Sequence, residues 1–356
     1  MELHDLGFDR AFADIAREHC GSDLSIARVT AVDRGRHVIR DELGELPAGL
    51  TGRLEFVAES SVDLPCVGDW VCARYLDDRS HAIIHSVLPR RSFLRRKVPG
   101  RDIDFQMIAA NIDVAFVIQS CHFDFNVRRL ERYLVMVRDG HIEPVLLLTK
   151  TDLISAQELE VRIGDIRRAG IDATLVTLSN VTGEGLDRVR ELLIPARTYC
   201  LLGSSGVGKT TLINRLAGAT ELETGDVSHT GEGRHTTTRR QLVVIEGGAL
   251  LIDMPGMREL GMLGVGEALD DTFADIGVLA KNCRFADCAH SGEPGCAVRA
   301  AIERHELGAA RLQDYLKLRK ESAFHDLSYV ERRKKDREFG RIVRSAMKLK
   351  DKRGGD

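Results

Sequence analysis

The N-terminal part of the chain alternates apolar and polar side chains in short runs, the pattern of β-strands that are buried on one face. Strands are expected within residues 26–42, 50–58, 67–76 and 82–89, and a polar turn at residues 33–36 divides the first stretch into two. Further turns are expected at residues 47–49 and 76–80. Five short strands within about 70 residues indicate a small β-barrel.

A barrel of this kind suits the oligonucleotide-binding (OB) fold, although other small barrels share the pattern. A short helix is expected ahead of it, at residues 8–19. Trp70, the only tryptophan, falls inside an expected strand, so we interpret it as a core residue rather than a surface for stacking bases. His81 and His85 lie in another expected strand without further ligand-type residues nearby, and we assign them no role.

The pattern changes after Ile103, where buried strands alternate with amphipathic helices. Strands are expected at residues 112–120, 144–150, 173–179 and 198–202, and helices at 126–140, 156–170, 186–193 and 209–218. Residues 241–256 then indicate two strands joined by a turn at Gly247 and Gly248. This alternation predicts a parallel sheet that is covered by helices. After about Asp275 the chain becomes polar and helical around a cluster of cysteines.

A glycine-rich loop, GSSGVGKTT, follows the strand expected at residues 198–202 and runs from Gly203 to Thr211. Its glycines allow backbone N–H groups to converge on phosphate oxygens, and the helix that follows adds the positive end of its dipole. Lys209 offers a charge to the outer phosphates, and the Thr210 hydroxyl can bind Mg²⁺. The loop therefore predicts a nucleotide site, but it does not distinguish GTP from ATP.

Two loops earlier in the chain are typical of guanine recognition. Residues 149–152, TKTD, approximate the pattern N-K-x-D at the end of an expected strand. A carboxylate at Asp152 can accept two hydrogen bonds that guanine offers and adenine does not. Thr149 stands where the pattern has Asn, and because a hydroxyl forms fewer hydrogen bonds than an amide, this change bears on nucleotide affinity more than on base identity. Ser179 and Asn180 are expected to form a second base-contacting loop.

The remaining elements of a GTPase come after the phosphate loop. Residues 231–240, GEGRHTTTRR, are polar and rich in threonine, and Asp253 to Gly256 end an expected strand. Asp253 can hold Mg²⁺ through water, and the N–H group of Gly256 can meet a γ-phosphate. The base-reading loops thus precede the phosphate loop, which is a cyclic shift of the usual order.

The sequence resembles the circularly permuted GTPases of the RsgA (YjeQ/EngC) family, which act in the assembly of the small ribosomal subunit. Stretches that carry the resemblance include AANIDVAFVIQS, LLTKTDL, GSSGVGKTTLINRL, GEGRHTTTRR, LIDMPGMRELGM and the cysteine cluster, and together they cover nearly the whole chain. The resemblance implies an α/β protein with an N-terminal OB-type β-barrel, a circularly permuted P-loop GTPase domain and a C-terminal helical zinc-binding domain.

We expect residues 1–34 to form an N-terminal extension with the first barrel strand, residues 35–100 the OB fold, residues 101–274 the GTPase domain and residues 275–356 the zinc-binding helical domain. The residues expected to contact GTP are Thr149, Lys150, Thr151, Asp152, Ser179, Asn180, Gly203, Ser204, Ser205, Gly206, Val207, Gly208, Lys209, Thr210, Thr211 and Gly256. The residues expected to hold Mg²⁺ are Thr210, Thr236, Thr237 and Asp253. Because the chain beyond Asp253 follows a segment that would sense the γ-phosphate, we expect nucleotide state to steer the C-terminal domain.

Hydrolysis needs a group that positions the attacking water. Many GTPases place Gln directly after the D-x-x-G stretch, but here that position is Met257, which cannot orient water, and the resembling family also has an apolar residue there. His235 is the best candidate within the chain, although a structural or RNA-facing role explains it equally well. The resemblance implies slow intrinsic turnover that the small ribosomal subunit stimulates.

The chain has 8 cysteines in two groups. Cys20, Cys66, Cys72, Cys121 and Cys200 are scattered along the sequence. In a large chain without an export signal, scattered cysteines are most often reduced core residues, and we expect that state here.

The other group is Cys283, Cys288 and Cys296, which lie close to His290. Three thiolates and one imidazole in a short span suit a closed, tetrahedral Zn²⁺ site. Four protein ligands leave no open position, so the expected zinc is structural. It would stabilise a segment that has little apolar core.

The formal net charge of −3 hides two basic stretches, at residues 89–101 and 331–353. Solvated surface explains them as well as a polyanionic partner does. Together with the barrel they could form an rRNA-binding surface, and the resemblance implies the 30S subunit and its 16S rRNA as partners. There is no apolar run of membrane length and no signal-peptide pattern, so a cytoplasmic protein with no membrane association is expected. We also expect the protein to be a monomer.

Our main interpretation is a GTP hydrolase that binds the 30S subunit during its late maturation and is stimulated by it. Two alternatives stay open at this point. One is an ATP-dependent RNA factor, against which Asp152 argues. The other is a non-catalytic RNA-binding module that uses the nucleotide as a stabilising ligand, which Met257 allows.

Overall fold

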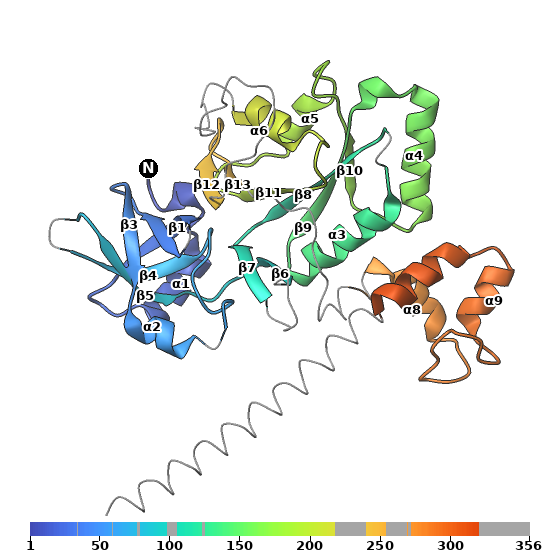
Figure 1. The fold of residues 1–356 in the computed structure, drawn as a ribbon, viewed down its shortest axis with the longest axis horizontal. Helices are drawn as coiled ribbons and strands as arrows, with labels where there is room; N and C mark the ends of the chain where they lie inside the picture. Colours follow the sequence, from blue (N-terminus) through green and yellow to red (C-terminus); the bar gives the residue numbers. More distant parts are fainter. Residues whose placement is uncertain are drawn as a thin grey trace, which may run out of the picture. The chain divides into compact units, whose positions relative to one another are not determined.

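The computed structural model describes residues 1–33, 35–58, 60–76, 79–97, 105–122, 125–217, 240–253, 269 and 272–319. Residues 1–96 and the described residues from 105 to 253 belong to one compact unit, and residues 272–319 belong to a second (Figure 1). The expected boundary between the barrel and the GTPase domain stays a prediction.

The first part of the larger unit contains η1 His4–Leu6, α1 Arg10–His19, β1 Ser25–Asp33, β2 Arg36–Arg40, β3 Glu45–Leu50, α2 Gly52–Val57, β4 Trp70–Tyr75, β5 Ala82–Val87 and β6 Phe93–Lys97. The second part contains β7 Phe105–Ala110, β8 Val114–Ser120, α3 Val127–Asp139, β9 Glu143–Thr149, η2 Thr151–Leu153, α4 Ala156–Arg168, β10 Thr174–Thr177, α5 Leu186–Glu191, β11 Thr198–Leu202, α6 Lys209–Ala217, β12 Arg240–Val244 and β13 Leu250–Asp253. The smaller unit contains α8 Ala274–Ala280 and α9 Ala297–Glu303, and residues 309–319 are also helical.

Strands β1 to β5 form the expected barrel. They are hydrogen-bonded in the order β1-β2-β3-β5-β4, and β4 pairs again with β1, which closes the barrel. The β3–β5 pair is parallel and the other pairs are antiparallel. Alternate strand residues such as Val29, Ile39, Val71 and Ile84 are fully buried and fill its interior. The prediction of a five-stranded barrel is therefore confirmed.

The third strand of the barrel lies earlier in the sequence than expected. The turn expected at residues 47–49 is part of strand β3, and the strand expected at residues 50–58 is mostly helix α2. Both predictions were wrong because a local cap overrides the apolar alternation. The Thr51 side chain accepts a hydrogen bond from the backbone N–H of Leu54, 3.2 Å away, which starts a helix at Gly52.

The second sheet has the predicted α/β pattern. Its strands lie in the order β10-β9-β8-β11-β13-β12, and every neighbouring pair is parallel except β12 with β13. Each strand and helix expected between residues 112 and 253 is found within a few residues of its predicted position. The short β6–β7 sheet, by contrast, was not foreseen from the basic stretch in which β6 lies.

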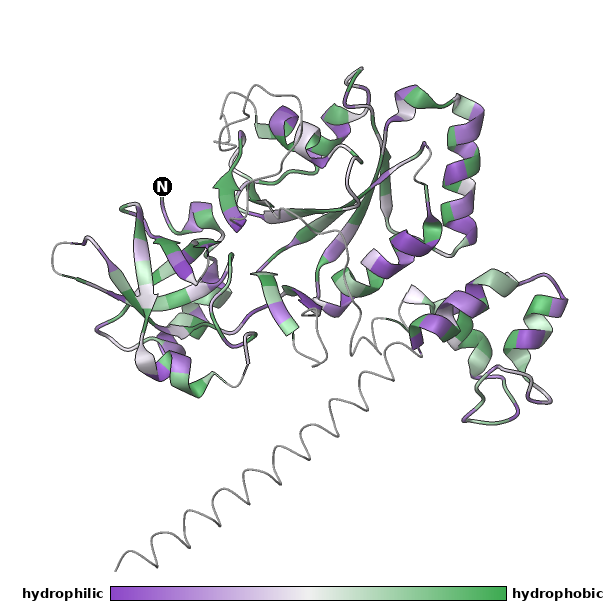
Figure 2. Ribbon diagram, in the orientation of Figure 1, coloured by the Kyte–Doolittle hydropathy of each residue, from purple (hydrophilic) through white to green (hydrophobic). Residues whose placement is uncertain are grey.

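Helices cover both faces of this sheet. Ala115 and Val117 of β8 pack in one core cluster with residues of α3 and α4, whereas Phe116 and Ile118 pack in another with residues of α5 and α6. Because successive side chains of a strand point to opposite faces, a strand between two helical layers is apolar at every position. Helices α3 and α4, which cover one face only, carry both hydrophobic and hydrophilic residues along their length (Figure 2).

The barrel and the α/β sheet are hydrogen-bonded into one sheet of 11 strands. Strand β1 of the barrel pairs antiparallel with β12, with Ala31 opposite Gln241 and Val32 opposite Arg240. The barrel is thus joined to the edge strand that follows the threonine-rich segment in the sequence.

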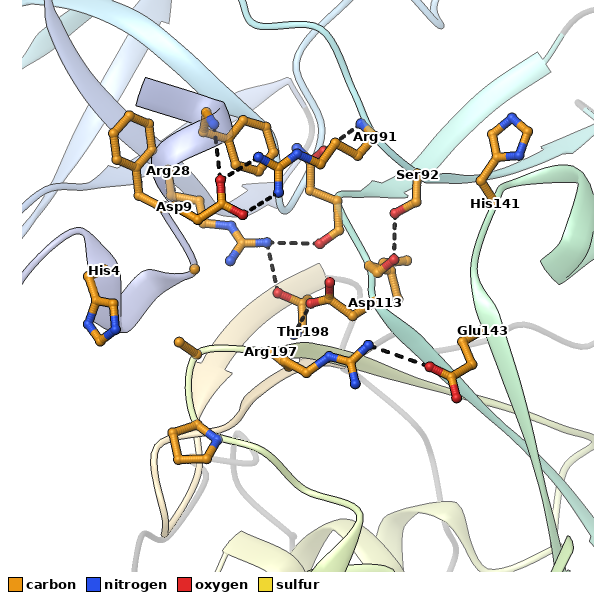
Figure 3. A pocket seen from close by; sticks show the side chains of 17 residues that line it. His4, Asp9, Arg28, Arg91, Ser92, Asp113, His141, Glu143, Arg197 and Thr198 are labelled. Atoms are coloured by element: carbon orange, nitrogen blue, oxygen red, sulfur yellow. Dashed lines mark hydrogen bonds and ion pairs between the residues drawn. The ribbon is translucent and has the colours of Figure 1, made fainter. Parts of the chain in front are cut away.

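Arg28 holds the same junction from within (Figure 3). Its guanidinium is buried and donates hydrogen bonds to the carbonyl oxygens of Leu6, Gly68 and Asn111 and to Thr198 Oγ1, which is 2.9 Å away. Burial lowers the pKa of Arg28 to about 10, so the side chain stays charged at neutral pH. Beside it lies a cavity of about 490 Å³.

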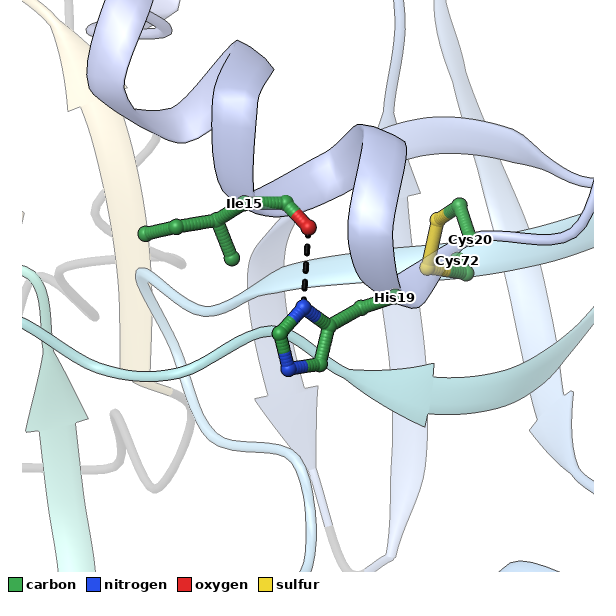
Figure 4. The surroundings of a disulfide bond; sticks show 4 residues. All are labelled: Ile15, His19, Cys20 and Cys72. Carbon is green, nitrogen blue, oxygen red and sulfur yellow. Dashed lines mark hydrogen bonds between the residues drawn. A yellow bond between two sulfur atoms is a disulfide. The ribbon is translucent and has the colours of Figure 1, made fainter.

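The N-terminal helix α1 is fixed to the barrel by aromatic packing and a disulfide. Trp70 is fully buried and contacts Phe8 and Phe12, with ring centroids 4.8 and 5.9 Å apart, so its assignment to the core is confirmed. Cys20, at the end of α1, is bonded to Cys72 of β4 (Figure 4).

The expectation of reduced cysteines is therefore wrong for Cys20 and Cys72, whereas Cys66, Cys121 and Cys200 are free and buried as expected. The two bonded residues are 52 positions apart, and only the docking of the helix on the barrel brings their Cα atoms to 5.7 Å. No local sequence pattern records such a contact.

The smaller unit packs α8, α9 and the helical residues 309–319 around a small core that includes Phe273, Ile276, Val298 and Tyr315. Arg311 forms a two-point ion pair with Asp275, at 2.6 and 2.8 Å. In the part of the chain that the structure describes, none of the helices has the length and apolar character needed to cross a bilayer.

Candidate nucleotide-binding site and metal centre

The phosphate loop lies between β11 and α6, as its mechanism requires. Gly203, Gly206 and Gly208 all have positive φ angles, of 158°, 80° and 98°. At Gly203 a Cβ atom would lie 2.3 Å from the carbonyl oxygen of Ile118, so this position accepts only glycine. The glycines of the phosphate-loop pattern therefore have the backbone conformation for which glycine is needed.

Lys209 is the first residue of α6, and its ammonium group lies inside the loop. Its Nζ donates hydrogen bonds to the carbonyl oxygens of Gly203 and Ser204, both 2.7 Å away. Thr210 and Thr211 are exposed in the same turn. The loop thus presents a positive charge, backbone N–H groups and hydroxyls on a helix N-terminus, a combination that suits an anion.

The first of the two loops expected to contact the base, residues 149–152, begins at the end of β9 and lies beside the phosphate loop. Thr149 is fully buried, and its hydroxyl donates a hydrogen bond to the carbonyl oxygen of Val207, 2.6 Å away. Lys150 has a left-handed backbone with a φ of 63°. Asp152 follows in η2 and accepts a hydrogen bond from the Ser179 hydroxyl, which fixes the direction of its carboxylate.

The second loop expected to contact the base, at Ser179 and Asn180, contacts both of the others. Besides the bond to Asp152, the Ser179 hydroxyl accepts hydrogen bonds from the backbone N–H groups of Val181 and Thr182, each 3.1 Å away. The Asn180 amide donates to the carbonyl oxygen of Gly208, 3.1 Å away. The structure therefore brings together three loops that the sequence predicted to act together. The bonds from Thr149 and Asn180 to the phosphate loop were not foreseen.

For the other expected site residues, the structure gives no side-chain contacts. His235, Thr236, Thr237 and Gly256 lie outside the described residues. Asp253 is the last residue of β13, which runs parallel to β11. Since β11 leads into the phosphate loop, the backbone of Asp253 ends its strand at the same edge of the sheet.

The candidate metal centre is formed by Cys283, Cys288, His290 and Cys296, whose ligand atoms all lie within 4.8 Å of one another. Cys296 Sγ lies 3.4 Å from His290 Nδ1, and Cys283 Sγ lies 3.7 Å from the same nitrogen and 4.0 Å from Cys296 Sγ. Two Zn–S bonds of about 2.3 Å at a tetrahedral angle place their sulfurs about 3.8 Å apart. The four residues thus fit a single tetrahedral ion.

The surroundings favour the metal-binding form of His290, and hydrogen bonds hold the loop that carries the ligands. Burial lowers the pKa of His290, which favours the neutral imidazole that a metal needs. Glu293 accepts hydrogen bonds from the backbone N–H groups of Ala289, Ser291 and Gly292, at 2.8 to 3.0 Å. These bonds hold the turn between the second and fourth ligands.

Comparison with known proteins agrees with this geometry. The family model described as RsgA GTPase matches residues 87–263. A protein of Opitutus terrae named small ribosomal subunit biogenesis GTPase RsgA is 43% identical over 337 residues, which cover 91% of this chain and 90% of the relative. The chain belongs to the RsgA GTPase family.

A second relative, small ribosomal subunit biogenesis GTPase RsgA 2 of Lactiplantibacillus plantarum, is 41% identical over 92% of each chain. Among solved structures, YloQ, described as a circularly permuted GTPase, is 26% identical with a TM-score of 0.58 over 85% of this chain and 96% of its own. YjeQ from Thermotoga maritima is 24% identical with a TM-score of 0.62, over 83% of this chain and 97% of its own.

The expected family, the α/β fold with an N-terminal barrel and the permuted order of the GTPase elements are therefore confirmed. The chain is a GTPase, which removes the interpretations as an ATP-dependent factor or a non-catalytic module.

Proposed function

We propose that this GTPase binds the 30S ribosomal subunit, acts in its late maturation and is stimulated by it in hydrolysing GTP. The relatives with which it shares about nine-tenths of its length are named small ribosomal subunit biogenesis GTPases. The observation that carries the proposal is the meeting of the two base-contacting loops with the phosphate loop, in permuted order, in a sheet that continues into a five-stranded barrel.

GTP would be held by the three loops. Backbone N–H groups of residues 203–211 and the Lys209 ammonium would bind the phosphates, while the Asp152 carboxylate would accept hydrogen bonds from guanine. Thr210 and Asp253, together with Thr236 and Thr237, are proposed to hold Mg²⁺, which would neutralise charge on the phosphates.

The attacking water needs a separate group, because the Met257 thioether has no hydrogen-bond donor and is only a weak acceptor. His235 is proposed to position this water. If His235→Ala kept both its basal and its ribosome-stimulated turnover, this role would be refuted. Gly256 is proposed to meet the γ-phosphate through its N–H group.

In the smaller unit, Cys283, Cys288, His290 and Cys296 are proposed to hold one structural Zn²⁺. The support is their ligand-atom spacing, which fits a tetrahedral ion and leaves no position for a substrate. The barrel and the basic stretches at residues 89–101 and 331–353 are proposed to contact 16S rRNA. We further propose that the protein acts as a monomer in the cytoplasm.

The deciding experiment is GTP hydrolysis by the full chain with and without purified 30S subunits, at several salt concentrations, with 50S subunits as the control. The proposal expects stimulation by 30S subunits alone, and weaker stimulation at high salt because contacts to rRNA phosphates are screened. Equal turnover with and without 30S subunits at every salt concentration would refute it.

A further inference from the structure

Two hydrogen bonds tie the base-contacting loops to consecutive residues of the phosphate loop. The Thr149 hydroxyl donates to the Val207 carbonyl at 2.6 Å, and the Asn180 amide donates to the Gly208 carbonyl at 3.1 Å. The Gly208 carbonyl also accepts the backbone N–H of Leu212, 2.9 Å away, in the first turn of α6. Both loops are thus bound to the segment that would grip the phosphates.

These bonds orient the N–H groups of the phosphate loop. In a planar trans peptide the C=O and N–H bonds point in opposite directions. The Val207 carbonyl shares its peptide with the N–H of Gly208, and the Gly208 carbonyl shares its peptide with the N–H of Lys209. When the carbonyls are held toward the base-contacting loops, the two N–H groups are directed to the other side of the phosphate loop.

The number of hydrogen-bond donors that the side chain of residue 149 offers explains why two side chains bind the phosphate loop. The guanine-recognition pattern has Asn there, whose amide offers two hydrogens, whereas a threonine hydroxyl offers one. Thr149 is fully buried, and its strongest bond is the one to Val207. A second bond to the phosphate loop therefore has to come from another residue.

Asn180 is fitted to supply that bond. A Cβ atom at Gly208 would lie 2.7 Å from Asn180 Nδ2, so the amide reaches the backbone only because residue 208 is glycine. The carbonyl of the Asn180 amide, Oδ1, is buried and has no hydrogen-bond partner among the described residues, so its position is set by the donor end of the amide.

We propose that Asn180 is a positioning residue that replaces the amide missing at residue 149. In this chain the amide has moved from the first base-contacting loop to the second, and Thr149 and Asn180 together hold the phosphate loop in its binding geometry. The inference rests on the proposed binding of guanine nucleotide by these loops and deepens it.

The test is a compensation experiment on the full chain, measured as affinity for fluorescent GDP and for a non-hydrolysable GTP analogue. Asn180→Ala should weaken both affinities about fivefold to tenfold, the loss that corresponds to one hydrogen bond. Thr149→Asn in the Asn180→Ala background should restore both affinities to within about twofold of the natural chain. Val181→Ser, an exposed neighbour in the same loop, is the matched control and should change neither affinity.

The proposal is overturned if Asn180→Ala binds both nucleotides as tightly as the natural chain, or if Thr149→Asn gives no rescue while the double variant keeps the thermal midpoint of Asn180→Ala. If Thr149→Asn does not fold, Thr149→Val with Asn180→Ala decides instead. Because both side chains hold the same loop, their losses of nucleotide affinity should be non-additive in a double-mutant cycle. Strictly additive losses would overturn the proposal. Since nucleotide binding is measured without ribosomes, a lack of stimulation by 30S subunits would count against the proposed function alone.

Discussion

Replacing Arg28 by lysine tests how the barrel is joined to the GTPase sheet. Lysine keeps the positive charge, but its single ammonium group cannot reproduce the flat fork of a guanidinium. The Arg28 fork donates to acceptors in three separate segments: the N-terminal segment, the barrel and the ends of the GTPase strands. Arg28→Lys should therefore break contacts across the junction without removing the buried charge.

The size of the effect follows from counting the acceptors that lose their donor. The Gly68 carbonyl keeps a second donor, the Asn111 amide at 3.1 Å, and the Thr198 hydroxyl can rotate. The carbonyls of Leu6 and Asn111 are the acceptors that depend on Arg28. Hydrogen bonds from a charged donor contribute about 1.5–3 kcal/mol each, so the loss of two predicts a free energy of unfolding about 3–6 kcal/mol lower.

The natural probe for the assay is Trp70. It is the only tryptophan in the chain, it is fully buried, and its ring centroid lies 5.3 Å from the Arg28 guanidinium carbon. Urea unfolding followed by tryptophan fluorescence therefore reports on this junction. With a slope of about 3 kcal/mol per molar urea, the predicted loss lowers the midpoint by about 1–2 M.

A matched control is Arg74→Lys, on the same barrel. Arg74 pairs with Asp23 in an exposed ion pair, so its substitution should change the free energy of unfolding by less than about 0.5 kcal/mol. If the midpoint of Arg28→Lys equals that of Arg74→Lys, the buried fork does not stabilise the junction and the reasoning is refuted.

Four further predictions concern the two sites and the N-terminal helix. Asp152→Asn should lower GTP affinity at least about tenfold and favour xanthosine triphosphate. The reason is that xanthine has an oxygen in place of the guanine amine, and an amide can donate a hydrogen bond to that oxygen. An unchanged preference for GTP in competition binding would contradict this prediction. Elemental analysis should find one zinc per chain. Removal of this metal by a strong chelator should unfold the smaller unit and leave GDP affinity unchanged. A zinc-free chain with an unaltered melting curve would exclude the site. The bond from the Arg91 guanidinium holds the pKa of Asp9 at about 2, so between about pH 4 and pH 2 the unfolded chain binds more protons and stability falls. Because the ion pair is largely exposed, that loss should stay below about 1 kcal/mol, and Asp9→Asn should lack it when the free energy of unfolding is followed against pH. Thiol titration of the denatured chain without reductant should find 6 free thiols rather than 8, because Cys20 and Cys72 are bonded; a count of 8 would contradict the disulfide.

The α/β part of the fold could be predicted from the sequence because its signals are local and strong. The run from Val114 to Ser120 is buried at every position, and such a run between two helical patterns has few other interpretations. The phosphate loop likewise depends on glycines whose positive φ angles are local requirements. The order of these elements then identified the permuted family.

The barrel was predicted less well because its strands are short and because a helix N-cap overrides the alternation of apolar and polar residues at one of the expected strands. Residues 50–58 alternate like a strand, yet the hydrogen bond between Thr51 and Leu54 starts a helix whose Phe56 is 91% exposed. Likewise, Pro47 and Gly49 suggested a turn, but Pro47 pairs with Val38 and Gly49 with Ile83 inside β3. Where local propensity and pairing disagree, tertiary contacts decide.

Contacts between segments that are distant in the sequence could not be predicted from it. These contacts attach the barrel to the GTPase sheet and stabilise it. The ladder between β1 and β12 and the fork of Arg28 join residues that no local pattern connects. Strand β1 has partners on both sides of the junction, since it pairs with β2 and β4 in the barrel and with β12 outside it. A fragment cut near residue 100 would leave Ala31 and Val32 of β1 without their partners in β12 and the Arg28 donors without two of their acceptors. The isolated barrel would therefore be less stable than the barrel of the intact chain, so the RNA binding proposed for it has to be tested on the whole protein.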